Sequence, residues 1–227
     1  MTRSIDVDSI ADALVRNAAP TLAGIKPASL FTFPGRFVGG ARERAAVLSR
    51  REAFLNALDA CRAELAASGV LIRVLVWRHC GALVYVYRPR SLARYLADPR
   101  AAMPLAGEGY RVNDLDACLD LLAERLEARG KFTVAAHDAE HDCPCTARSC
   151  RARFPHEIGF FLGYPYADVA GFMEHEGRDF ILMGQWKVYA DPAGALALFE
   201  RIKTCTERCC EQRARGAGLA ELAACAA

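Results

Sequence analysis

The 227-residue sequence has no long apolar run, few lysines and almost no net charge. No stretch approaches the roughly 18 consecutive apolar residues of a membrane span, so we expect no transmembrane helix. The formal net charge is +2, and no polybasic segment is present. Charge therefore predicts neither nucleic-acid binding nor association with an anionic membrane.

The first residues also lack the features of an export signal. Met1 to Asp8 carries acidic side chains and no long apolar stretch. A signal peptide needs such a stretch, so we expect a cytoplasmic protein. In that reducing compartment the ten cysteines are predicted to be buried thiols, metal ligands or redox centres rather than a disulfide framework.

Two further absences bear on the fold. The chain has no glycine-rich phosphate loop and no strand–helix–strand spacing, which argues against a doubly wound nucleotide-binding fold. It also has no internal repeat and no long linker, so residues 1–227 are predicted to form one domain. With 53% hydrophobic residues, the chain can bury a sizeable core.

Two pairs of short apolar segments predict β-hairpins. Leu71–Trp77 and Ala82–Tyr87 are rich in valine and tyrosine and lie close together in the sequence. Phe180–Met183 and Trp186–Tyr189 flank Gly184-Gln185, a two-residue turn signal. Because an isolated hairpin is only marginally stable in water, we predict that both hairpins pair into a single antiparallel sheet.

Helical signals occur in most of the remaining segments. The predicted helices cover residues 6–18 (ending before Pro20), 52–67, 91–96, 113–130, 155–162, 166–175 and 191–213. Residues 22–34 are rich in glycine and proline and are predicted to be irregular. The predicted fold is therefore α+β, a single domain of six to seven helices around a small antiparallel sheet built from two β-hairpins.

One stretch of the sequence is distinctive. FPHEIGFFLGYPYADVAGFMEHEG occupies Phe154–Gly177, and GQWKVYAD follows at Gly184–Asp191. Both resemble motifs of a bacterial family that is catalogued as a domain of unknown function and found mostly in anaerobes. The resemblance covers most of the chain but implies no activity. Members of the family pass more directly into the FPHEIG motif, so the Cys/His-rich residues at about 131–153 are interpreted as an insertion.

The FPHEIG motif predicts a candidate catalytic site. Pro155 favours the first helical position, which places His156 and Glu157 in the first turn, where the helix dipole favours a carboxylate and a neutral imidazole. That pair suits a general base or a metal ligand. We expect both residues to line a pocket, with Lys187 as a third catalytic candidate. The alternative is that Glu157 only caps the helix while His156 makes a structural hydrogen bond.

Three more residues are candidates for binding a substrate. Lys26, Arg88 and Tyr164 are assigned this role, and Lys26 and Arg88 are expected to converge with Lys187 as a set of cations. The corresponding hypothesis is an enzyme or redox accessory protein that binds a small anionic substrate, a cofactor or a redox partner. The alternative for Lys187 is an ordinary exposed position on a strand.

A second hypothesis uses different chemistry. Five potential metal ligands lie close together in the sequence, namely His137, His141, Cys143, Cys145 and Cys150. Thiolates and imidazoles suit zinc or an iron–sulfur cluster. The C-x-C-x4-C spacing is not that of zinc ribbons or ferredoxins, so a loop with reduced thiols is the alternative. On this hypothesis the protein handles or senses metal without catalysis.

The FPHEIG segment also has the apolar spacing of a helix-turn-helix. A helix that reads DNA needs exposed basic or amide side chains to reach phosphates and base edges. The second helix of this segment instead carries small residues together with Asp168 and Glu174. DNA binding is therefore disfavoured.

Overall fold

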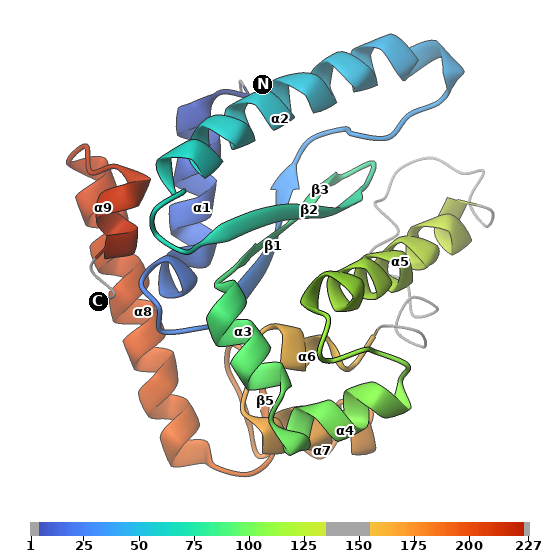
Figure 1. The fold of residues 1–227 in the computed structure, drawn as a ribbon, viewed down its shortest axis with the longest axis vertical. Coiled ribbons are helices and arrows are strands. Elements are labelled where there is room, and N and C mark those ends of the chain that lie inside the picture. Colours follow the sequence, from blue (N-terminus) through green and yellow to red (C-terminus); the bar gives the residue numbers. More distant parts are fainter. Residues whose placement is uncertain (1–4, 135–154, 225–227) are drawn as a thin grey trace.

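The structure is a computed structural model that describes residues 5–134 and 155–224 (Figure 1). These residues form nine α-helices, a short 3-10 helix and five strands, which confirms the predicted α+β class. In chain order the elements are α1 (Val7–Leu22), β1 (Ala28–Pro34), the 3-10 helix (Ala41–Glu43), α2 (Arg44–Glu64), β2 (Leu71–Trp77), β3 (Gly81–Tyr87), α3 (Pro89–Leu96), α4 (Pro99–Gly107), α5 (Leu115–Val134), α6 (Ile158–Phe161), α7 (Tyr166–Glu174), β4 (Leu182–Met183), β5 (Lys187–Val188), α8 (Pro192–Ala214) and α9 (Leu219–Ala224).

The larger sheet is antiparallel and has the strand order β1-β3-β2. Its central strand, β3, is buried at all seven positions. Side chains alternate between its two faces, with Ala82, Val84 and Val86 in one apolar cluster and Leu83 and Tyr85 in another. Alternation with a period of two is the geometry of a pleated strand, so β3 contributes to two cores.

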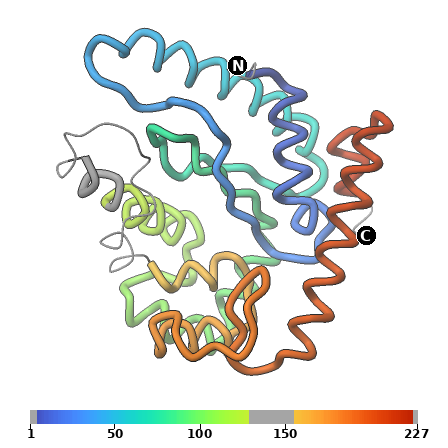
Figure 2. Tube along the Cα trace, turned by 180° about the vertical axis from the view of Figure 1, so that it is seen from behind, coloured from blue at the N-terminus to red at the C-terminus, as the bar shows by residue number. Residues whose placement is uncertain are grey.

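Helices cover both faces of this sheet (Figure 1). The first apolar cluster joins one face to α1, α2 and α9, and the second joins the other face to α3 through α7. Figure 2 shows the same division from behind, with the C-terminal helices beside the N-terminal helix. Helix α8 packs along α1, and its first turns cover Trp186 and Val188 of the smaller hairpin.

The prediction that both hairpins form one sheet is wrong. The second partner of β3 is β1, in which Leu30 lies opposite Tyr85. The hairpin β4–β5 forms a separate two-stranded sheet. Residues 22–34 were predicted to be irregular because of their glycine and proline content. Pro27 and Pro34 flank or end the strand, and its partner β3 is far away in the sequence, so local composition does not reveal the pairing.

Several helix boundaries also differ from the predictions. Helix α1 continues through Pro20, whose carbonyl oxygen accepts hydrogen bonds from the amides of Ile25 and Lys26. Helix α2 starts at Arg44 rather than at residue 52, and its first turns were missed because they are mostly exposed and carry no apolar stripe. Helices α4 and α9 were not predicted. In residues 5–134 and 155–224, no helix combines the length and apolar character that a membrane crossing requires.

Candidate ligand-binding site

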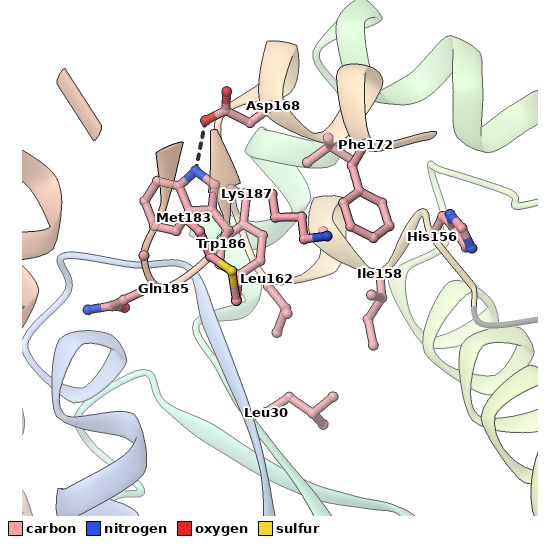
Figure 3. Close-up of a pocket in the computed structure, with 14 residues that line it drawn as sticks. Leu30, His156, Ile158, Leu162, Asp168, Phe172, Met183, Gln185, Trp186 and Lys187 are labelled. Atoms are coloured by element: carbon pink, nitrogen blue, oxygen red, sulfur yellow. Dashed lines mark hydrogen bonds between the residues drawn. The ribbon is translucent and has the colours of Figure 1, made fainter. Parts of the chain in front are cut away.

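A cavity of about 340 Å³ lies between α6, α7 and the β4–β5 hairpin, and we call it the α6–α7 cavity. Most of the side chains that line it are apolar. Its lining consists of Leu30, His156, Ile158, Gly159, Leu162, Tyr164, Asp168, Val169, Phe172 and residues 183–187. Figure 3 shows that the lining comes from β1, from the segment that includes α6, from α7 and from the hairpin. The cavity therefore depends on segments that are separated in the sequence.

Lys187 brings an ammonium group to the wall of this cavity. Its Nζ donates a hydrogen bond to the carbonyl of Gly177 and lies 4.6 Å from the ring centroid of Phe180 and 5.9 Å from that of Phe172. Figure 3 shows the nitrogen turned toward Phe172, inside the ring of labelled side chains. An ammonium has three N–H donors, so Lys187 keeps donors for a ligand.

His156 lies on the same wall. Its ring centroid is 5.2 Å from that of Phe172, and the side chain is half-buried. In Figure 3 the imidazole is at one edge of the cavity and Gln185 is at the opposite edge. The structure therefore brings His156 and Lys187, two of the three predicted catalytic residues, to one cavity.

Glu157 lies outside the lining of the cavity. The residue is only 4% exposed, and its carboxylate accepts a hydrogen bond from the Tyr110 hydroxyl at 3.0 Å. It also forms an ion pair with Arg125 of α5, which contacts Glu108 at 3.3 Å. Burial, followed by the nearby Glu157 charge, raises the pKa of Tyr110 well above its ordinary value. The predicted pairing of Glu157 with His156 at a pocket is therefore not present.

The local backbone also differs from the expected helix start. Helix α6 begins at Ile158, and Glu157 is its N-cap without a side-chain capping bond. His156 lies in the turn before the helix rather than in its first turn. The helix has only four residues, so it offers little dipole to bias the imidazole. Pro155 therefore precedes a turn of two residues and is not the first residue of the helix.

Asp168 has a role that the sequence analysis did not find. The residue is 3% exposed, and its Oδ2 accepts a hydrogen bond from Trp186 Nε1 at 2.7 Å. Its Oδ1 accepts from the backbone amides of Tyr189 at 2.8 Å and Ala190 at 3.2 Å. Asp168 thus attaches α7 to the hairpin. The available signal was Trp186, because a buried indole N–H usually requires an acceptor.

Lys26 and Tyr164 lie at one side of the cavity. Tyr164 lines it and stacks on Trp186 with a centroid separation of 4.9 Å. The Nζ of Lys26 lies 4.8 Å from the Tyr164 ring, but Lys26 is not part of the lining. Burial lowers the pKa of Lys26 from 10.5 to about 8. Lys26 therefore supports an aromatic wall and does not reach the predicted substrate position.

Arg88 has a structural role, and the predicted convergence of three cations is wrong. Its guanidinium donates to four backbone carbonyls, those of Thr21, Leu22, Ser68 and Ala223. These bonds join the end of α1 to the turn before β2 and to α9. Among the three predicted cations, Lys187 alone lines the α6–α7 cavity.

The predicted metal ligands His137, His141, Cys143, Cys145 and Cys150 lie outside the described residues. Within residues 5–134 and 155–224, no three His, Cys, Asp or Glu side chains are grouped to hold a metal ion. The zinc or iron–sulfur hypothesis for the Cys/His-rich segment therefore stays a prediction.

The fold and the cavity define an α+β protein with a small, mainly apolar cavity that carries one lysine ammonium. A protein-family model described as "Protein of unknown function (DUF3793)" matches residues 14–223. Because the match covers most of the chain, the protein belongs to this family, and the resemblance to a family of unknown function is confirmed. No curated protein and no solved structure matches the chain.

Proposed function

We propose that this protein binds a small amphipathic ligand, with an apolar body and one anionic group, in the α6–α7 cavity. The observation that carries this proposal is the ammonium of Lys187 on the wall of an otherwise mainly apolar cavity. The anionic group would accept hydrogen bonds from Lys187, and the apolar body would contact Ile158, Leu162 and Phe172. His156 is positioned to donate a further hydrogen bond from the edge of the cavity.

The size and polarity of the cavity agree with such a ligand. Small-molecule sites occupy roughly 300–1,000 Å³ and combine apolar walls with a few polar groups. Burial of the apolar body contributes about 25 cal/mol per Å² removed from water. A charge-assisted hydrogen bond in a partly desolvated site is stronger than the same bond in water, so Lys187 would supply the preference for an anion.

The positions of the carboxylates favour binding over acid–base catalysis. Glu157 was expected to act beside His156 in acid–base catalysis, but its carboxylate is bound by Arg125 and Tyr110. Asp168 also lines the cavity, and its two oxygens already accept three N–H groups. An enzymatic role would therefore have to use His156 and Lys187 without a carboxylate partner from the described residues. The alternative of metal handling by His137, His141, Cys143, Cys145 and Cys150 stays a prediction from the sequence.

Tryptophan fluorescence tests this proposal directly. The chain has two tryptophans, and Trp77 packs in the first apolar cluster against Phe37 and Phe54, away from the α6–α7 cavity. A Trp77→Phe variant leaves Trp186 as the reporter on the cavity wall. Decanoate and decanol form a matched pair of probes because they share an alkyl chain and differ in charge. We expect both to change the emission of Trp186, with decanoate binding more tightly.

Substitutions at Lys187 test whether its ammonium causes the preference for decanoate over decanol. Lys187→Met should weaken decanoate binding about tenfold, which corresponds to about 1.4 kcal/mol, and should leave decanol binding unchanged. Lys187→Arg should retain most of the preference. Lys203→Met is the control, because Lys203 is exposed on α8 and outside the cavity lining. Equal binding of decanoate and decanol by the parent protein, or no response to either, would show that the proposal is wrong.

A further inference from the structure

A second cavity, of about 470 Å³, lies between α8, the residues that follow α1, and α9, and we call it the α8 cavity. It shares no lining residue with the α6–α7 cavity. Its apolar lining includes Ile25 and Leu222, and α8 contributes two cysteines and two arginines, namely Cys205, Cys209, Arg201 and Arg208. Two thiols in one cavity are a set of ligands that soft metal ions prefer.

The two cysteines are placed to act on the same ligand. Cys205 and Cys209 are four residues apart on α8, and residues at this spacing share one face of a helix. Their side chains form a hydrogen bond with each other, so the two sulfur atoms are neighbours. Cys205 is half-buried at the cavity, and Cys209 is 6% exposed and packs into the first apolar cluster.

We propose that Cys205 and Cys209 form a two-thiolate site for the soft monovalent ion Cu(I). Thiolates favour Cu(I), zinc and iron–sulfur clusters, and of these the d¹⁰ Cu(I) ion can be held by two sulfur ligands alone. A structural zinc site requires four ligands. No group of three His, Cys, Asp or Glu side chains occurs in the described parts of the chain, so the pair suits a two-coordinate ion better than zinc. This site is independent of the ligand proposed for the α6–α7 cavity.

The charged side chains around Cys205 and Cys209 complement the charge of the site with Cu(I) bound. Binding of one Cu⁺ to two thiols forms two Cu–S bonds, releases two protons and leaves a complex of net charge −1. Arg201 and Arg208 line the same cavity and supply positive charge, which Glu200, also in the lining, partly offsets. Both thiols must lose their protons to bind the ion. Protons therefore compete with the metal, and loading should weaken as the pH falls.

The experiment requires a background without the cysteines of the Cys/His-rich segment, because these would also bind Cu(I). In the variant C143S/C145S/C150S, Cu(I) is titrated without oxygen against the chromogenic chelator bicinchoninate. We expect one Cu(I) per chain and the release of two protons. Cys205→Ser and Cys209→Ser should each weaken binding by more than the roughly 10- to 100-fold that loss of an outer-shell contact costs.

Two matched controls decide the assignment. Cys210 follows Cys209 directly but lines a different cavity, and Cys80 is exposed in the β2–β3 turn, so Cys210→Ser and Cys80→Ser should retain the metal. Thermal unfolding of the metal-free proteins checks that each variant is folded. If Cys209→Ser is unstable, the Cu(I) affinity of Cys205→Ser tests the proposal, because Cys205 is only half-buried. Unchanged binding in Cys205→Ser, or equal loss in Cys210→Ser, would overturn the proposal.

Discussion

Two buried carboxylates near the α6–α7 cavity are held by different chemistry. Glu157 is 4% exposed and pairs with a guanidinium and a phenol, whereas Asp168 is 3% exposed and accepts three N–H groups from neutral donors. Glu157 attaches the turn before α6 to α5. Asp168 attaches α7 to the β4–β5 hairpin. Asp168 therefore joins two elements that line the cavity, and Glu157 anchors the segment between the lining residues His156 and Ile158.

The comparison indicates which carboxylate is more sensitive to substitution. Arg125 is 31% exposed at its side chain and also contacts Glu108, so it keeps a partner and some solvent if Glu157 is removed. The indole N–H of Trp186 and the amides of Tyr189 and Ala190 all depend on Asp168. Buried donors without an acceptor are costly, so substitution of Asp168 should lower the stability more than substitution of Glu157.

The largest effect is expected for Asp168→Ala. Loss of the acceptor leaves up to three N–H groups without a partner and should lower the free energy of unfolding by about 3 kcal/mol. Urea unfolding measures this change, and the emission of Trp186 should shift to the red as its ring becomes hydrated. Glu174→Ala, at an exposed position at the end of the same helix, is the control and should cost less than about 0.5 kcal/mol. Equal destabilisation by the two variants would contradict this role for Asp168.

A smaller effect is expected for Glu157→Gln. The amide retains the shape of the side chain but removes its negative charge, and we expect a loss of about 1.5 kcal/mol because Arg125 remains partly solvated. Glu108→Gln tests the same arginine from its exposed side and should cost less than about 0.5 kcal/mol. Chemical denaturation of both variants gives the comparison. If Glu108→Gln is as destabilising as Glu157→Gln, burial of the Glu157 pair is not the important difference.

The smallest effect on stability is expected for Lys26. It packs over Tyr164 and forms no ion pair with any acidic residue in the described ranges, and burial lowers its pKa to about 8. The unfolded lysine keeps its proton to about pH 10.4. Between about pH 8 and pH 10 the unfolded state therefore binds more protons, so the contribution of Lys26 to stability rises with pH.

The variant Lys26→Met isolates this contribution, because it removes the titrating group while other groups cancel in the difference. At pH 7 the variant should be more stable than the parent protein, and its advantage should shrink by about 1 kcal/mol between pH 7 and pH 9. Urea unfolding at both pH values measures the change. Lys203→Met, at an exposed position, should show no such pH dependence. An advantage that is constant or grows with pH would contradict the assignment.

Much of the sheet could be predicted from local pattern, but its third strand could not. The valine- and tyrosine-rich segments around residues 78–81 predicted the hairpin β2–β3, because β-branched and aromatic residues favour strands. Strand β1 was missed because Pro27 and Pro34 mark its ends as irregular. Its hydrogen-bonding groups are satisfied by β3, and a partner far along the chain leaves no local signal.

The same distinction applies to the candidate site. The motifs around residues 156 and 187 predicted His156 and Lys187 as site residues, and both line the α6–α7 cavity. The roles of Arg88 and Glu157 were not accessible in this way. Arg88 binds carbonyls from three separate parts of the chain, and Glu157 pairs with an arginine on α5. No neighbouring residue in the sequence identifies these partners.

By itself, the sequence determined the α+β class, the hairpin segments and the family of this protein, because periodicity, turn residues and motifs are local properties of the chain. The tertiary structure alone decided which polar groups share a cavity. A buried carboxylate requires hydrogen-bond or ion-pair partners, and packing between distant segments supplies them. For that reason Glu157 is held by Arg125 while Lys187 lines the cavity beside His156.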